Sequence, residues 1–137
     1  MGSILNYIKI RLGYSDEPDI IIDTQIMDSI NTAFAVLSQI GTGLKGDFVI
    51  TSSNETWDQY CTGNVALVEL IKSYIYCKTK LEFDPSANST INDSLTRRIA
   101  ELESRINSAT DYPDDQVVNS ATDYPDDQVV NEGGENV

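Results

Sequence analysis

The residue types that most often carry chemistry in proteins are scarce in this chain. It contains no histidine, which removes Ser-His and Cys-His nucleophile pairs, histidine-ligated metals and the usual general base at neutral pH. Its two cysteines, Cys61 and Cys77, are too few and too far apart for a zinc knuckle or a CxxC redox pair. No base or cationic cluster near Cys61 in the sequence lowers the pKa of its thiol. We therefore interpret both cysteines as reduced, partly buried small hydrophobic residues.

Two stretches resemble ligand-binding loops only in part. GTGLKG, residues 41–46, has the glycines and lysine of a phosphate-binding loop, but it follows a predicted helix and lacks the GK[ST] ending. The repeated DYPDD offers the carboxylates that Ca²⁺ prefers, but it lacks the alternating Asp and the turn glycine of an EF-hand loop. No pair of carboxylates stands out as a general acid and base. The sequence therefore predicts no enzyme, no metal site and no cofactor.

The charge of the chain is strongly and unevenly negative. Its 137 residues include 22 acidic and nine basic side chains, for a net charge of −13. Residues 1–106 hold 14 acids and all nine bases, whereas residues 107–137 hold eight acids and no base. This balance argues against a surface that grips DNA by neutralising phosphates. The N-terminal stretch, apolar only at intervals, matches neither a signal peptide nor a membrane span, so we expect a cytosolic protein.

The acidic tail contains an exact tandem repeat. NSATDYPDDQVV at residues 107–118 recurs without a change at 119–130. Neither copy has a helical or strand period, so neither can build a core by itself. We therefore divide the chain into a folded domain, residues 1–106, and an acidic tail, residues 107–137.

Apolar spacing predicts an all-α domain, a small bundle of about four helices with a long glycine-rich loop. The expected helices cover residues 4–12, 20–40, 64–83 and 89–106. The loop at 41–56 carries a β-branched run at 48–51 that could form a brief strand, and a short helical turn should hold Trp57 and Tyr60. The Asp84-Pro85 step should stop the long apolar helix before the last one begins.

The three longer helices should share one apolar interior. The broad stripe at 64–83 marks the helix around which the others pack. We expect four of its residues to be among the most buried: Leu67, Leu70, Ile71 and Tyr74. The last helix should face them with one seam, formed by Ile91, Leu95, Ile99, Leu102 and Ile106. Its opposite face should form i,i+4 ion pairs from Arg97 to Glu101 and from Glu101 to Arg105.

The order of these segments resembles the small head–tail connector proteins of long-tailed bacteriophages. The similarity covers roughly residues 1–106. It rests on ILNYIKIRLGYSDEPD, an amphipathic helix ending near IG, a glycine-rich loop with a Trp-Asp-x-Tyr step, VELIKSYIYCKTKLEFDPSANS, and a final charged helix. Its most telling part is the long helix that runs through KLEFDP into the last helix.

The resemblance implies a structural part of the virion. Connectors of this family form a homo-oligomeric ring, typically a dodecamer, on the portal protein at the capsid vertex. The ring extends the channel for DNA and offers a platform to the next neck or tail-completion protein. Such a protein is made in the host cytoplasm, needs no membrane, and lets DNA pass without specific binding, which an acidic wall favours. The duplicated tail departs from the family pattern, so its role does not carry over.

Two segments should make the contacts of such a ring. A small bundle leaves the 41–56 loop and the polar face of the last helix without partners inside one chain, so we expect subunits to join there head to tail. The candidate contact residues are Lys45, Phe48, Val49, Arg97, Arg98, Glu101 and Arg105. We expect the tail to bind the portal or a neighbouring subunit through Tyr112, Pro113, Val117, Val118, Tyr124, Pro125, Val129 and Val130.

Two other interpretations stay open at this point. An acidic helical inhibitor could imitate DNA phosphates with its carboxylates, and it would be a monomer or a dimer rather than a ring. The tail, for its part, could be a solvated and repulsive fringe, as acidic low-complexity tails often are.

Overall fold

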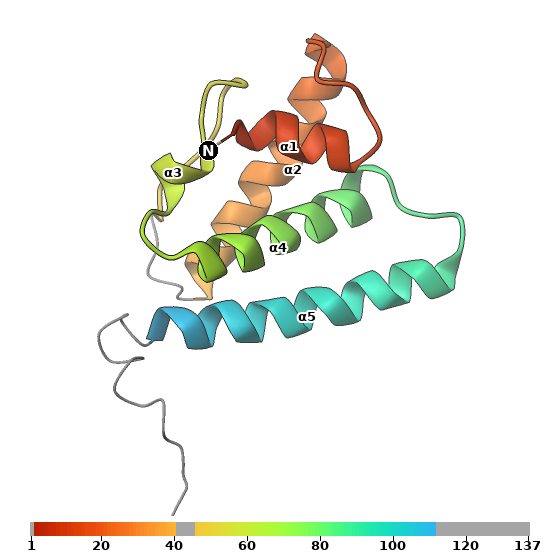
Figure 1. Cartoon of the computed structure of the whole chain (residues 1–137). Helices are drawn as coiled ribbons and strands as arrows, with labels where there is room; N and C mark the ends of the chain where they lie inside the picture. The colour runs from red at the N-terminus through yellow and green to blue at the C-terminus, as the bar shows by residue number, and fades with distance from the viewer. Residues whose placement is uncertain (1, 41–45, 112–137) are drawn as a thin grey trace, which may run out of the picture.

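The computed structural model describes residues 2–40 and 46–111, and this part of the chain is all-α (Figure 1). Its helices are α1 (Ile4–Arg11), α2 (Ile20–Gln39), α3 (Trp57–Tyr60), α4 (Val65–Phe83) and α5 (Ser89–Asp111). The predicted all-α class is therefore confirmed for these residues, with the expected helical turn at Trp57 counted as a fifth, very short helix.

Local side-chain chemistry explains where the first four helices begin and end. The side chains of Ser3, Asp19 and Asn64 accept hydrogen bonds from backbone N–H groups in the first turns of α1, α2 and α4. At the start of α3, the backbone N–H of Thr56 donates to the Gln59 side chain at 2.9 Å. Gly13 follows α1 with a φ of 98°, a conformation that glycine adopts without steric cost.

The Asp84-Pro85 step separates α4 from α5 as predicted. Asp84 caps the C-terminus of α4, and its carboxylate lies 3.2 Å from the Lys80 ammonium. The chain then turns back through two hydrogen bonds between Asn92 and the backbone of Ser86, at 3.0 and 2.8 Å. These bonds hold the start of α5 against the turn, so the two longest helical segments of the C-terminal half fold into an antiparallel pair.

Helix α5 is longer than the sequence predicted. It continues past Ile106 to Asp111, through the first five residues of the first repeat copy. Ala109, in this extension, packs against the core. The added turn is therefore in contact with the domain, although the spacing of apolar residues in the sequence does not indicate this. Helix α5 thus extends five residues beyond the predicted helix end at 106.

Helix α4 is the centre of the domain. It contacts α1, α2 and α5, and Figure 1 shows α5 antiparallel along one side of α4, with α1 and α2 on the other side. Ile71 and Tyr74 are fully buried and Leu67 nearly so, as predicted. Leu70 is only half-buried at the edge of the core, so its prediction as a most-buried residue was wrong, because it lies on the side of α4 that no helix covers completely.

The apolar seam of α5 is also shorter than expected. Ile99, Leu102 and Ile106 are buried and Leu95 is half-buried, but Ile91 is exposed. Ile91 lies in the first turn of α5, beside the connecting turn, where α4 has already ended. A repeat of apolar residues in the sequence therefore marks the face of the helix, but not how far along the helix the partner reaches.

The described part of the long loop, residues 46–56, has no strand at 48–51. The Asn31 side chain of α2 instead accepts a hydrogen bond from the Ile50 N–H at 2.8 Å and donates to the Ile50 carbonyl at 2.9 Å. Because one amide side chain satisfies both backbone groups, Ile50 is buried without a strand partner. Both cysteines are reduced and buried, as expected.

Helix α2 resembles a membrane span in its length and composition. Among the described residues it alone is long and apolar enough, by length and composition, to cross a bilayer. Its apolar side is used within the domain, since Ile26, Ile30, Ala33, Phe34 and Leu37 all belong to the core. The same composition is typical of the core helix of a soluble protein.

The central position of α4 predicts a clear difference between two neighbouring residues. Ile71→Ala should lower the free energy of unfolding by about 2–5 kcal/mol, because it leaves a cavity where α4 meets its neighbours. Leu70→Ala is the matched control and should cost distinctly less, since Leu70 is half-buried. Urea denaturation followed by circular dichroism measures both. Equal losses would show that α4 does not hold the centre of the core.

Candidate functional site

The predicted contact residues of α5 lie on its exposed side, where Arg98 also borders α4 beside Cys77. Arg97, Arg98, Glu101 and Arg105 are all exposed. Arg105 pairs with Glu101 at 2.9 Å, as expected. Arg97 does not form the predicted pair with Glu101 and instead donates to the Ser94 hydroxyl at 3.4 Å. The charge of Arg97 is therefore not neutralised by Glu101. The i,i+4 spacing in the sequence predicted an ion pair between these two residues.

The loop that was expected to lack partners is well anchored where the structure describes it. Phe48 packs against Phe34 and Tyr60, with ring centroids 5.4 and 5.2 Å apart. The premise that residues 41–56 have no partner inside the chain is thus wrong for residues 46–56. Val49 is exposed, whereas Lys45 lies outside the described residues.

A carboxylate stabilises the turn that follows. Glu55 accepts hydrogen bonds from the backbone N–H and hydroxyl groups of Thr51 and Ser52, at 3.0 to 3.2 Å. Burial by itself would raise the pKa of Glu55, but these hydrogen bonds outweigh it and hold the pKa below its ordinary value. The backbone carbonyl of Glu55 also accepts from the Ile4 N–H at 3.0 Å. The loop is therefore fixed against both α1 and α2.

Exposed apolar side chains form part of the surface that sequence reasoning missed. Ile20 is 84% exposed and Ile21 69% exposed at the start of α2, and Val65 is 71% exposed at the start of α4. Ile10 projects from α1 off its buried stripe. The run Ile20-Ile21-Ile22 in the sequence indicates this exposure. Only one or two residues per helical turn face a core, so three consecutive apolar residues cannot all be buried there. Contiguous apolar patches mark surfaces that meet another protein, and Ile20 and Ile21 place two adjacent apolar side chains at the start of α2.

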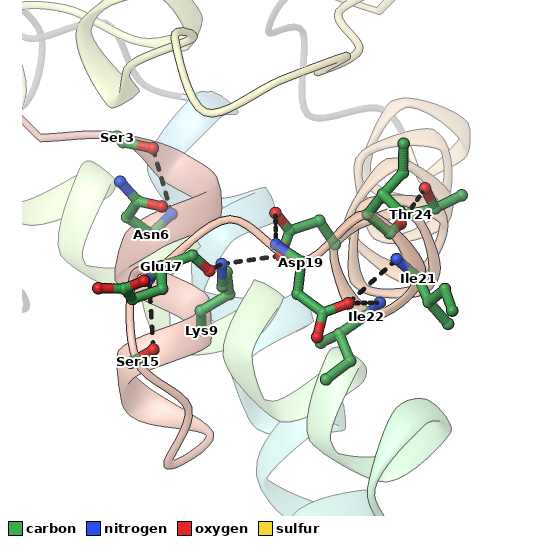
Figure 2. Close-up of polar contacts among 11 residues, drawn as sticks. Ser3, Asn6, Lys9, Ser15, Glu17, Asp19, Ile21, Ile22 and Thr24 are labelled. Carbon is green, nitrogen blue, oxygen red and sulfur yellow. Dashed lines mark hydrogen bonds and ion pairs between the residues drawn. The ribbon is translucent and has the colours of Figure 1, made fainter.

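A pocket of about 380 Å³ opens beside Ile20, between α1, the start of α2 and the 51–53 turn. Its lining is mixed, with Leu5 and Met27 among the apolar residues and three carboxylates from Asp16, Asp19 and Asp23. Figure 2 shows the polar contacts along this edge. Within the described chain, no three His, Cys, Asp or Glu side chains gather so as to hold a metal ion.

The polar edge of this pocket depends on a buried cation. Lys9 is only 2% exposed, and its ammonium lies 2.8 Å from an Asp23 carboxylate oxygen. It also donates to the backbone carbonyl of Glu17 at 2.7 Å (Figure 2). The same Asp23 carboxylate accepts from the Asp19 N–H at 3.2 Å. One lysine therefore joins α1, the following turn and the first turn of α2.

Acidic residues collect at this end of the domain. Five of the 14 acids in residues 1–106 lie between positions 16 and 28, at Asp16, Glu17, Asp19, Asp23 and Asp28. Lys9 is buried against two of these positions, so the outer surface here is negative. The predicted tail contacts, from Tyr112 to Val130, lie outside the described residues.

The described domain is all-α, and it has an anchored loop, exposed apolar residues at helix ends and charges on different faces. These are features of an assembly module, a protein that works through contacts with other chains. The chain belongs to the phage connector protein family, whose model matches residues 4–113. No curated protein and no solved structure matched it. The family indicates a structural head–tail connector role in a bacteriophage, at the neck of the virion, in association with portal and neck proteins.

The buried lysine makes a prediction about this end of the domain. Lys9→Met should lower the free energy of unfolding by about 3–5 kcal/mol, because it leaves the Asp23 carboxylate largely buried without its cation. Adding Asp23→Leu should restore most of the loss, since an apolar pair removes the stranded charge. Urea denaturation of both variants measures the coupling. If the double variant lost the sum of the free energies lost by the two single variants, Lys9 and Asp23 would not be coupled.

Proposed function

We propose that the protein forms a closed ring on the portal, extends the channel through which DNA passes, and offers a platform to the next neck or tail-completion protein. The observation that carries this proposal is the family match, which spans nearly all of the folded domain. It is supported by a domain whose described surface keeps apolar helix ends and unpaired charges rather than a catalytic arrangement.

Subunits of the ring meet head to tail in this proposal, since only unlike surfaces can close a ring of more than two copies. The exposed face of α5, with Arg97, Arg98, Glu101 and Arg105, supplies one surface. Val49, with Lys45 before it in the chain, belongs to the other surface. Phe48 packs on Phe34 and so fixes the loop segment that carries Val49. DNA passes the ring without specific binding, because the chain is acidic overall.

The tail extends the reach of each subunit in the same proposal. Tyr112-Pro113 and Tyr124-Pro125 supply aromatic anchors beside rigid prolines, and the Val-Val pairs at 117–118 and 129–130 supply small apolar ones. Anchors separated by polar spacers suit extended binding along a partner. The partner is the portal or a neighbouring subunit.

Assembly onto the portal tests the proposed function directly. Native mass spectrometry of the protein mixed with its portal should show a single large complex with many copies of this chain, because the portal provides the template for the ring. Arg97→Glu combined with Arg98→Glu should weaken the complex, since the charge of the α5 face is reversed. A chain that stays monomeric or dimeric with portal present would contradict the connector role and favour an acidic inhibitor.

Truncation tests the tail separately from the ring. Removing residues 112–137 leaves α5 intact to Asp111, so the folded domain should keep its denaturation midpoint. Docking onto the portal should become weaker, and restoring one repeat copy should recover it. Unchanged docking by the truncated chain would mean that the tail is a solvated fringe.

A further inference from the structure

Cations stack on aromatic rings between α1 and α4. The Arg11 guanidinium lies 4.2 Å from the centroid of the Tyr76 ring and 5.8 Å from that of Tyr7. It also donates to the Tyr7 hydroxyl at 3.1 Å. The Lys72 ammonium lies 5.0 Å from the Tyr7 ring centroid. We call these four residues, Tyr7, Arg11, Lys72 and Tyr76, the cationic strip.

A third positive charge lies close to the strip. Burial raises the pKa of Cys77 in α4, and the charges of Arg98 from α5 and of Arg11 from α1 act against this rise. The charges of one arginine in α5 and one in α1 therefore both act on this part of α4. Positive charge is gathered along this side of α4 in a protein that is otherwise acidic.

The strip is only partly neutralised. Lys72 pairs with Glu69 at 3.2 Å. Arg11 is exposed and forms no ion pair with any described residue. Its guanidinium is held in place by the Tyr7 and Tyr76 rings and by the Tyr7 hydroxyl. A planar, pre-oriented guanidinium of this kind is well suited to bind a carboxylate through two hydrogen bonds.

We propose that the cationic strip binds the acidic tail of this same protein, residues 112–137. This segment carries seven acids and no base, so it complements the strip in charge. Each repeat copy places an adjacent aspartate pair, Asp114-Asp115 or Asp126-Asp127, directly after Tyr-Pro. The carboxylates bind Arg11 and Lys72, and the neighbouring tyrosine packs against the rings of the strip.

The position of the tail makes this contact reachable. The tail follows Asp111 at the end of α5, and Figure 1 shows this end of α5 beside the first turns of α4. Lys72 lies seven residues into α4, which is about 10 Å along the helix. Twenty-six extended residues span up to roughly 86 Å. The tail can therefore reach the strip of its own chain or of an adjacent copy, and its two identical copies raise the local concentration of the binding segment.

Photo-crosslinking of the full-length protein tests this contact. Tyr112 and Tyr124 are replaced, one at a time, with benzoylphenylalanine, and the crosslinked peptides are identified by mass spectrometry. We expect crosslinks to the segments 7–11 of α1 and 72–76 of α4. The mass of the product, one chain or two, tells whether the tail binds its own domain or a neighbouring copy, and either result supports the proposal.

Charge variants show whether the strip itself is recognised. Arg11→Gln should lower the crosslink yield about fivefold, as expected for the loss of one exposed ion pair. Lys78→Gln is the matched control, because it removes the same charge from α4 outside the strip, and it should leave the yield unchanged. Replacing the four repeat aspartates with asparagine should lower the yield as Arg11→Gln does. Added salt should also lower it.

Two results would overturn the proposal. One is crosslinking that maps to other parts of the domain. The other is an equal effect of Arg11→Gln and Lys78→Gln, which would reflect overall charge only. The experiment contains no portal, so its failure would leave the proposed connector function untouched, and a chain that failed to assemble on its portal could still show this contact.

Discussion

The buried Lys9 ammonium is the constraint on which the N-terminal half of the domain depends. A cation that is 2% exposed must find charged or polar partners within the fold. Its partners come from two separate segments, the Asp23 carboxylate of α2 and the Glu17 carbonyl of the preceding turn. Satisfying one charge therefore fixes where α2 begins relative to α1. The pocket, the acidic edge and the exposed isoleucines of the α2 start all follow from that arrangement.

Two other polar side chains, those of Tyr74 and Asn31, also join separate elements of the domain. The Tyr74 hydroxyl donates to the Glu103 carboxylate at 2.9 Å and joins α4 to α5. Burial and this nearby carboxylate both raise the pKa of Tyr74, so its hydroxyl remains a donor. Asn31 in turn supplies both hydrogen bonds that the buried backbone of Ile50 needs. These groups fix helices and a loop relative to one another, a use that fits a structural protein.

Charge is sorted onto different sides of the domain. Carboxylates gather at the start of α2, whereas Arg11 and Lys72 lie between α1 and α4. Unlike charges on separate faces favour contacts between different surfaces of identical subunits, and they disfavour pairing of one face with itself. The same separation leaves a positive surface that an acidic tail can bind. A small domain of one sequence can thus offer more than one kind of contact.

The sequence by itself determined the helices, the stop at Asp84-Pro85 and the family. These features depend on periodicity and on local hydrogen bonds, which neighbouring residues specify. Only the tertiary structure decided the half-burial of Leu70, the exposure of Ile91, the anchoring of the 46–56 loop by Asn31, and the extension of α5 to Asp111. It also brought Arg11 over Tyr76, 65 positions apart in the chain. Each of these outcomes depends on where a distant helix ends or packs, and no local pattern records that.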